Sequence, residues 1–176
     1  YMTPMLRASQ EKDPLVKSND VPILFHHLPT LIGLSSRILA TRTSAPDKRP
    51  MDFLVPSLGH QWLQFQEEWV VFLKYAVHFE VNTKSIKRAC TNGLLLKIEQ
   101  ESLTRRDTKR MGMADYLIAP IQRVPRYCLL LKDLLKYTPT THDDYWDLVK
   151  VFDTMTGLAR AMNDTQKLHR RKTTMA

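Results

Sequence analysis

Apolar residues recur along much of the chain at intervals of three and four, the spacing that places side chains on one face of an α-helix. Over residues 20–39 this spacing predicts a helix with Asp20 as its N-cap and Pro22 in its first turn. The apolar face of this helix is expected to contain Leu24, Leu28, Leu31, Ile32, Ile38 and Leu39. Residues 41–50 show no such period and include two prolines, so we expect a mobile loop there.

Aromatic residues dominate the next apolar stripe, which we therefore expect to be buried in the core. Its members, at helical spacing, are Trp62, Phe65, Trp69, Phe72, Leu73 and Ala76. Asn82 then provides a candidate N-cap for a further helix. The apolar positions of that helix are Ile86, Ala89, Cys90, Gly93 and Leu96.

The strongest helical pattern begins near Met113 and ends before Pro139. Its apolar positions are Leu117, Ile121, Val124, Cys128, Leu131 and Leu135. Pro120 and Pro125 lie inside it, and because each removes a backbone donor and crowds the preceding turn, we expect bends rather than a straight rod. A last helix follows, with Asp143 or Asp144 near its positive N-terminus. It is predicted to bury Tyr145, Leu148, Val149, Phe152, Met155, Ala159 and Met162.

The chain shows no alternating strand pattern of useful length and no internal repeat. The sequence therefore predicts an all-α fold, an elongated bundle of about five or six helices. Its 176 residues suit a single domain, residues 1–176, with a basic C-terminal end at residues 165–176. No charged leader and no uninterrupted apolar run of membrane-spanning length is present, so we expect a soluble, cytoplasmic protein.

The residue constellations of covalent enzymes are absent: there is no glycine-rich phosphate loop, G-x-S-x-G, H-E-x-x-H or C-x-x-C. His26 and His27 are adjacent, so on a helix their side chains point about 100° apart and cannot chelate one metal. The pairs 67–68 and 143–144 are neighbouring acids that solvation and helix dipoles explain. Cys90 and Cys128 are predicted to be buried thiols. We therefore predict no catalytic residue, no metal site and no cofactor.

One segment carries a specific motif. Residues 116–139 read YLIAPIQRVPRYCLLLKDLLKYTP, which closely resembles the most conserved helix of Dbl-homology domains, L-I-x-P-(I/V)-Q-R-(I/V)-x-(K/R)-Y-x-L-L-L-x-x-L-L-x-x-T. Residues 1–5 and 25–39 look like the family's first and second conserved helices, and residues 161–164 like a stretch of its last long helix. The resemblance spans nearly the whole chain. It places the start of the first helix, with an invariant acidic residue, before Tyr1, so we expect that part to be lacking here.

The resemblance implies a guanine-nucleotide exchange factor that binds the switch regions of a Rho-family small GTPase, stabilises its nucleotide-free state and promotes GDP release without covalent chemistry. Gln122, Pro125 and Arg126 match positions that face the second switch, and Asn163 matches one that contacts the same region. Lys132 lies where the family meets acidic residues of the GTPase. Rho signalling to the cytoskeleton and cell polarity, with recruitment to the plasma membrane or cell cortex, is also implied.

Some roles within the motif stay open. Leu117 and Ile118 match the place that reads the size of an aromatic residue on the GTPase, but each could equally be core. The leucines at 129–131 and 134–135 are predicted to be core rather than interface. Arg123 is expected to serve an internal ion pair rather than the partner.

A net charge of +8 keeps a second hypothesis open, a non-catalytic helical scaffold or a module that binds anionic membranes. Residues 84–110 contain eight basic and three acidic residues, and residues 167–172 read KLHRRK. The basic residues are not expected to share one face edged by large apolar residues, as an interfacial helix requires. A nucleic-acid partner is not predicted, because no aromatic residues are interleaved with the charge.

Overall fold

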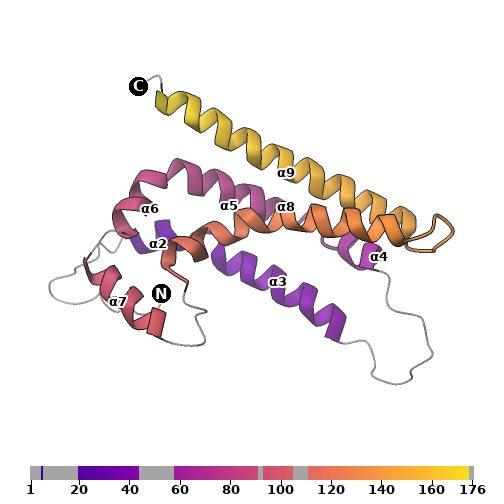
Figure 1. Cartoon of the computed structure of the whole chain (residues 1–176), viewed down its shortest axis with the longest axis horizontal. Helices are drawn as coiled ribbons and strands as arrows, with labels where there is room; N and C mark the ends of the chain where they lie inside the picture. The colour runs from indigo at the N-terminus through magenta and orange to yellow at the C-terminus, as the bar shows by residue number, and fades with distance from the viewer. Residues whose placement is uncertain (1–4, 6–19, 44–57, 91–92, 105–110, 175–176) are drawn as a thin grey trace.

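The computed structural model describes residue 5 and residues 20–43, 58–90, 93–104 and 111–174, which together form an elongated, all-helical bundle (Figure 1). Within these residues no strand is present, so the predicted all-α class is confirmed. The helices are α2 (Asp20–Phe25), α3 (Leu28–Thr43), α4 (Leu58–Leu63), α5 (Val70–Val81), α6 (Thr83–Cys90), α7 (Gly93–Thr104), α8 (Met113–Tyr137) and α9 (Tyr145–Thr174).

The helix predicted over residues 20–39 is divided at His27, which has a left-handed φ of 64°. A residue other than glycine rarely adopts this backbone conformation inside a helix, so α2 ends before His27 and α3 begins after it. The amide of Leu31, in the first turn of α3, donates to the His27 carbonyl at 3.0 Å. Ile32 and Leu39, predicted on the apolar face, are 65% and 62% exposed. The loop predicted at 41–50 is wrong at its start, because α3 continues to residue 43, and the rest lies outside the described residues.

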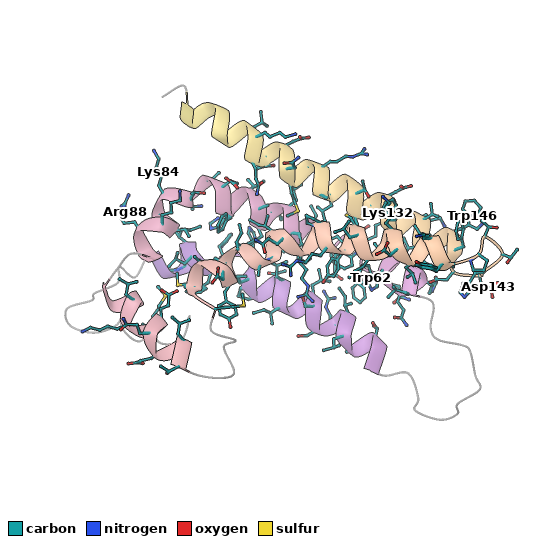
Figure 2. The ribbon with its side chains drawn as sticks, in the orientation of Figure 1. Trp62, Lys84, Arg88, Lys132, Asp143 and Trp146 are labelled. Carbon is teal, nitrogen blue, oxygen red and sulfur yellow. The ribbon has the colours of Figure 1, made fainter. Side chains whose placement is uncertain are left out.

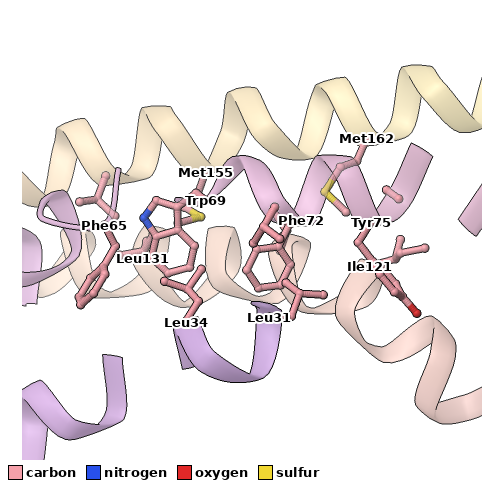
Figure 3. Close-up of a cluster of buried hydrophobic side chains, with 14 of the residues drawn as sticks. Leu31, Leu34, Phe65, Trp69, Phe72, Tyr75, Ile121, Leu131, Met155 and Met162 are labelled. Atoms are coloured by element: carbon pink, nitrogen blue, oxygen red, sulfur yellow. The ribbon is translucent and has the colours of Figure 1, made fainter. Parts of the chain in front are cut away.

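The core lies where α5 packs beside α8 and α9, with α3 closing one side. Figure 3 shows Trp69 beside Leu131 of α8 and Met155 of α9, with Phe72 next along the cluster and Tyr75 nearer Ile121 and Met162. The stripe is thus largely buried as predicted, although Trp62 and Leu73 are only half-buried. The stripe does not follow a single helix, because hydrogen-bonded turns at residues 64–69 separate α4 from α5.

A second buried cluster joins α2, α6 and the start of α8. Its members are Met5, Leu24, Ile86, Met113 and Leu117. A hydrogen bond links the two clusters, because the buried Tyr75 hydroxyl donates to the Leu117 carbonyl at 2.6 Å. The first turn of α8 is held from α7, where Glu99 accepts the Met113 amide at 2.9 Å. From there α8 runs through Pro120 and Pro125 as one continuous helix.

Two polar residues expected at helix N-termini bond to other elements. The Asn82 amide group donates backward to the His78 carbonyl of α5 at 2.9 Å, so its side chain closes α5 rather than opening α6. Asp144 immediately precedes α9, but its buried carboxylate accepts the backbone amides of Gly59 and His60 at 2.8 and 3.0 Å. It therefore caps α4, which lies far away in the sequence.

One stretch of the described chain, Pro22–Thr41, is apolar and long enough to cross a membrane by composition, with a mean hydropathy of 1.2. In the structure it is two helices separated by a turn at His26 and His27. A bilayer would leave the backbone groups of that turn without partners. Leu24, Leu31 and Leu34 of this stretch are buried against the rest of the protein, so we assign it to the bundle.

Candidate functional site

The exposed side of α8 carries most of the residues predicted to bind a partner. Gln122, Pro125, Arg126 and Lys132 are all exposed. At about 100° per residue they fall within an arc of about 120° on the helix, so they form one continuous surface strip. Buried residues such as Val124 and Leu131 hold the opposite side of α8 in the core and fix the direction in which the strip faces.

The structure distinguishes Leu117 from Ile118, the two apolar residues that could belong either to the core or to the interface. Leu117 is 1% exposed and lies in the second buried cluster, so the structure supports its core role and corrects its assignment to the binding surface. Ile118 is half-buried and lies one turn before Gln122 on the same face. Only Ile118 of this pair extends the α8 strip.

Apolar residues that the sequence analysis placed in the core lie within the α8 strip or beside it. Leu129 and Leu130 are 66% and 65% exposed, and Leu134 is exposed as well. Of the five leucines, Leu131 is buried and Leu135 is half-buried. A signal was available in the sequence: three consecutive leucines span about 200° of a helix, more than one buried face accommodates. Exposed leucines beside polar residues suit a surface that another protein covers.

A groove between α8 and α9, with a volume of about 490 Å³, lies beside the strip. Pro125, Cys128 and Leu129 line its α8 side. Arg160, Asn163 and Gln166 line its α9 side. The structure therefore brings the predicted residue Asn163 to the same groove as Pro125, although 38 positions separate them in the sequence. Arg160 and Gln166 were not predicted, because no motif marks them.

Cys128 forms part of the groove wall and is half-buried. Burial raises the pKa of its thiol, so the protonated form is favoured, as expected of an unreactive structural cysteine. The other cysteine, Cys90, has its side chain outside the described part.

Arg123 differs from Arg126 in what it contacts. Its Nε donates to the Tyr127 hydroxyl at 2.6 Å, and its guanidinium lies 5.5 Å from the centroid of the same ring. The partner in this contact is a phenol rather than a carboxylate, so the contact is not the internal ion pair that the sequence analysis expected. Arg123 also lines a second, apolar groove between α3 and α8, so it faces away from Asn163.

The described residues include no group of three His, Cys, Asp or Glu side chains that could hold a metal ion. One member of each acidic pair, at 67–68 and at 143–144, has a structural partner. Glu68 accepts a hydrogen bond from Arg37 of α3 at 3.0 Å, and Asp144 caps α4. What the site offers is a surface for binding: amide, guanidinium and ammonium donors beside exposed leucines and an open groove.

Known proteins are similar to this chain over most of its length. The model of the RhoGEF domain family matches residues 1–163. Rac guanine nucleotide exchange factor JJ of Dictyostelium discoideum is 23% identical over 169 residues, and Rho guanine nucleotide exchange factor osg-1 of Caenorhabditis elegans is 25% identical over 163 residues. These matches cover 95% and 93% of this chain, but only 14% of the length of each relative.

Solved structures show the same fold. The structure of autoinhibited Vav1 is similar to 97% of this chain with a TM-score of 0.75, at 24% sequence identity and over 29% of that chain. The ternary complex of human RhoA, its inhibitor and the DH/PH domain of human ARHGEF11 contains a chain that is similar over 96% of this chain and 51% of its own length, with a TM-score of 0.71 and 18% identity.

Proposed function

The chain belongs to the RhoGEF domain family, and from this membership we propose that it is a guanine-nucleotide exchange factor that binds the switch regions of a Rho-family small GTPase, stabilises the nucleotide-free state and promotes GDP release. The family match over residues 1–163 is the observation that carries the proposal. The names of the relatives support the class of partner, since they are exchange factors for Rac and Rho. RhoA itself is present in the ARHGEF11 complex.

The catalytic effect would come from binding alone. Linkage requires that two ratios be equal. The exchange factor lowers the affinity of the GTPase for nucleotide as many times as the nucleotide lowers the affinity of the GTPase for the exchange factor. Every tenfold preference for the empty GTPase therefore corresponds to about 1.4 kcal/mol of nucleotide binding energy that the factor can offset. Such a mechanism needs an extended complementary surface and no nucleophile or proton donor.

The α8 strip and its groove supply the chemistry for this task. Arg126 has five N–H donors in a rigid fork, suited to carbonyl and carboxylate oxygens of a switch segment. Gln122 and Pro125 flank it, and Asn163 lies across the groove on α9. Lys132 is exposed and lies further along the strip (Figure 2). We assign it to acidic residues of the GTPase.

Ile118 and the exposed leucines would supply the apolar part of the contact. Removing Leu129 and Leu130 from water against a partner would favour association without any change within the domain. Ile118 lies at the far end of the strip and is the candidate for reading the size of a partner side chain. Differences of a methylene group at such a contact discriminate between substrates by roughly 10- to 200-fold.

The test measures the affinity of the chain for a panel of Rho-family GTPases, each prepared both free of nucleotide and loaded with GDP and magnesium. An exchange factor binds at least one empty GTPase much more tightly than its loaded form. Release of a fluorescent GDP analogue from that GTPase should accelerate with the concentration of the chain. Equal affinity for both forms would identify a scaffold, and no binding to any empty GTPase would overturn the proposal.

A further inference from the structure

Helix α6 presents a basic face at one end of the bundle. Lys84, Lys87 and Arg88 are all exposed. At about 100° per residue the three fall within an arc of about 100°, and Ile86 lies on the opposite side, buried in the second cluster. Helix α6 contains no acidic residue. Three of the eight basic residues of 84–110 therefore share one face, although the sequence analysis did not expect these residues to share a face edged by large apolar residues.

The position of this face is fixed by packing. Ile86 anchors α6 in the core, and the Thr83 hydroxyl donates to the Phe79 carbonyl of α5 at 2.9 Å. Helix α6 also packs against α2 and α7. Figure 2 shows Lys84 and Arg88 projecting outward from this end of the molecule. Because these cations are held on a rigid helix, the backbone loses little conformational freedom when they bind a surface.

An exposed apolar residue adjoins the basic face. Val81, the last residue of α5, is 66% exposed and precedes Lys84 by one helical turn. Cations with apolar residues at their edge are what a bilayer interface accommodates, because the cations meet lipid headgroups and the apolar groups reach the acyl boundary. Single-stranded nucleic acid would favour aromatic side chains for stacking, and α6 contains none.

A second basic segment lies at the same end of the bundle. Figure 1 shows that α6 and the C-terminal end of α9 share one end of the long axis. Helix α9 continues to Thr174, so its last turns carry the sequence KLHRRK of residues 167–172. Lys132 and Trp146 lie toward the other end, as Figure 2 shows. A planar surface that contacts α6 would therefore leave much of the α8 strip open.

We propose that the basic face of α6, formed by Lys84, Lys87 and Arg88, docks the domain on the anionic surface of a lipid bilayer. This inference is independent of the proposed exchange activity. Each basic residue close to an anionic membrane strengthens binding by a similar increment, so the three together contribute on the order of 100-fold to membrane partitioning. Binding is expected to weaken as the salt concentration rises, because the contact is exposed.

The test is co-sedimentation of the protein with phosphatidylcholine vesicles that contain or lack phosphatidylserine. The variant Lys84→Ala/Lys87→Ala/Arg88→Ala is compared with Lys74→Ala/Lys136→Ala/Lys150→Ala, which loses the same net charge from exposed positions on α5, α8 and α9. All six changes are at exposed helical sites where alanine is a good helix former, and circular dichroism checks that both variants remain folded. Binding of duplex DNA is measured in parallel.

We expect binding only to vesicles with phosphatidylserine, a loss on the order of 100-fold in the α6 variant and a much smaller loss in the matched variant. Absence of binding by the unmodified protein would overturn the proposal. An equal loss in both variants would also overturn it, because net charge rather than a face would then be responsible. Tighter binding to duplex DNA with the same dependence on α6 would identify a nucleic-acid surface instead.

Discussion

The carboxylate of Asp144 accepts the backbone N–H of Gly59 at 2.8 Å, which ties the residue before α9 to the first turn of α4 across 85 positions of sequence. The other carboxylate oxygen accepts the N–H of His60 at 3.0 Å. Glycine is required for the approach, because a Cβ at position 59 would lie 2.5 Å from the Leu148 amide nitrogen. This contact fixes the position of the start of α9, the helix that carries Asn163 on one side of the groove.

The Asp144→Ala substitution should lower the free energy of unfolding by about 1–3 kcal/mol, since it removes two hydrogen bonds to otherwise uncapped amides in a buried place. Urea denaturation provides the measurement. Asp143→Ala is the matched control, because that carboxylate is exposed and its removal should change stability by less than about 0.5 kcal/mol. Equal effects of the two substitutions would contradict the capping role.

The Gly59→Ala substitution should destabilise the protein by more than about 2 kcal/mol, because backbone atoms of α9 occupy the space that the new methyl group needs. Gly33→Ala is the matched control. Gly33 lies inside α3, and a methyl group added there would meet no atom of another element within 4 Å, so alanine should stabilise by about 0.5–1 kcal/mol. Thermal unfolding of both variants would show opposite shifts in Tm, and shifts of the same sign would refute the close packing of α4 on α9.

The Tyr75→Phe substitution should cost about 1 kcal/mol at neutral pH through loss of the hydrogen bond to Leu117. Burial raises the pKa of Tyr75 above its ordinary value of 10.0. The associated stability is therefore complete below pH 10 and is lost as rising pH ionises this tyrosine in the unfolded chain but not in the folded one. The stability difference between the two proteins should shrink in alkali, and a constant difference would argue against a buried neutral phenol.

Two neighbouring arginines of α8 should respond differently in the binding assay. Arg126→Ala is expected to weaken binding to the nucleotide-free GTPase by roughly 10- to 100-fold, because an arginine at the centre of an interface is a frequent hot spot. Arg123→Ala should weaken it by less than about threefold, since that guanidinium bonds to Tyr127. Surface plasmon resonance with the empty GTPase gives both values. A larger loss for Arg123→Ala would mean that the partner contacts the α3 side of α8.

The consecutive leucines provide a test of which residues serve stability and which serve binding. Leu131→Ala removes a side chain that is 2% exposed and should cost about 2–5 kcal/mol of stability. Leu129→Ala should leave stability within about 0.5 kcal/mol, since the side chain is mostly in solvent, but weaken GTPase binding by roughly tenfold. Denaturation and binding are measured on the same preparations. Unchanged GTPase binding by Leu129→Ala would remove Leu129 from the interface.

The sequence by itself determined the helical class, the extent of α8 between Met113 and Pro139, and the aromatic core stripe, because each follows from local spacing and from proline. The Gln-Arg and triple-leucine motif within α8 also led from sequence alone to the family that the comparisons then showed. These features depend on residues within a few turns of one another. They are encoded locally and can be read locally.

Tertiary structure alone decided which polar and apolar residues face which partner. Nothing near Asp144 in the sequence reveals that its carboxylate caps α4, because the amides it binds are brought to it only when α4 packs on α9. The break at His27 and the pairing of Pro125 with Asn163 in one groove likewise depend on how whole helices pack. Periodicity predicts that each helix has a buried side, but the neighbouring helices determine how wide that buried side is. Leu129 therefore lies in solvent while Leu131 lies in the core.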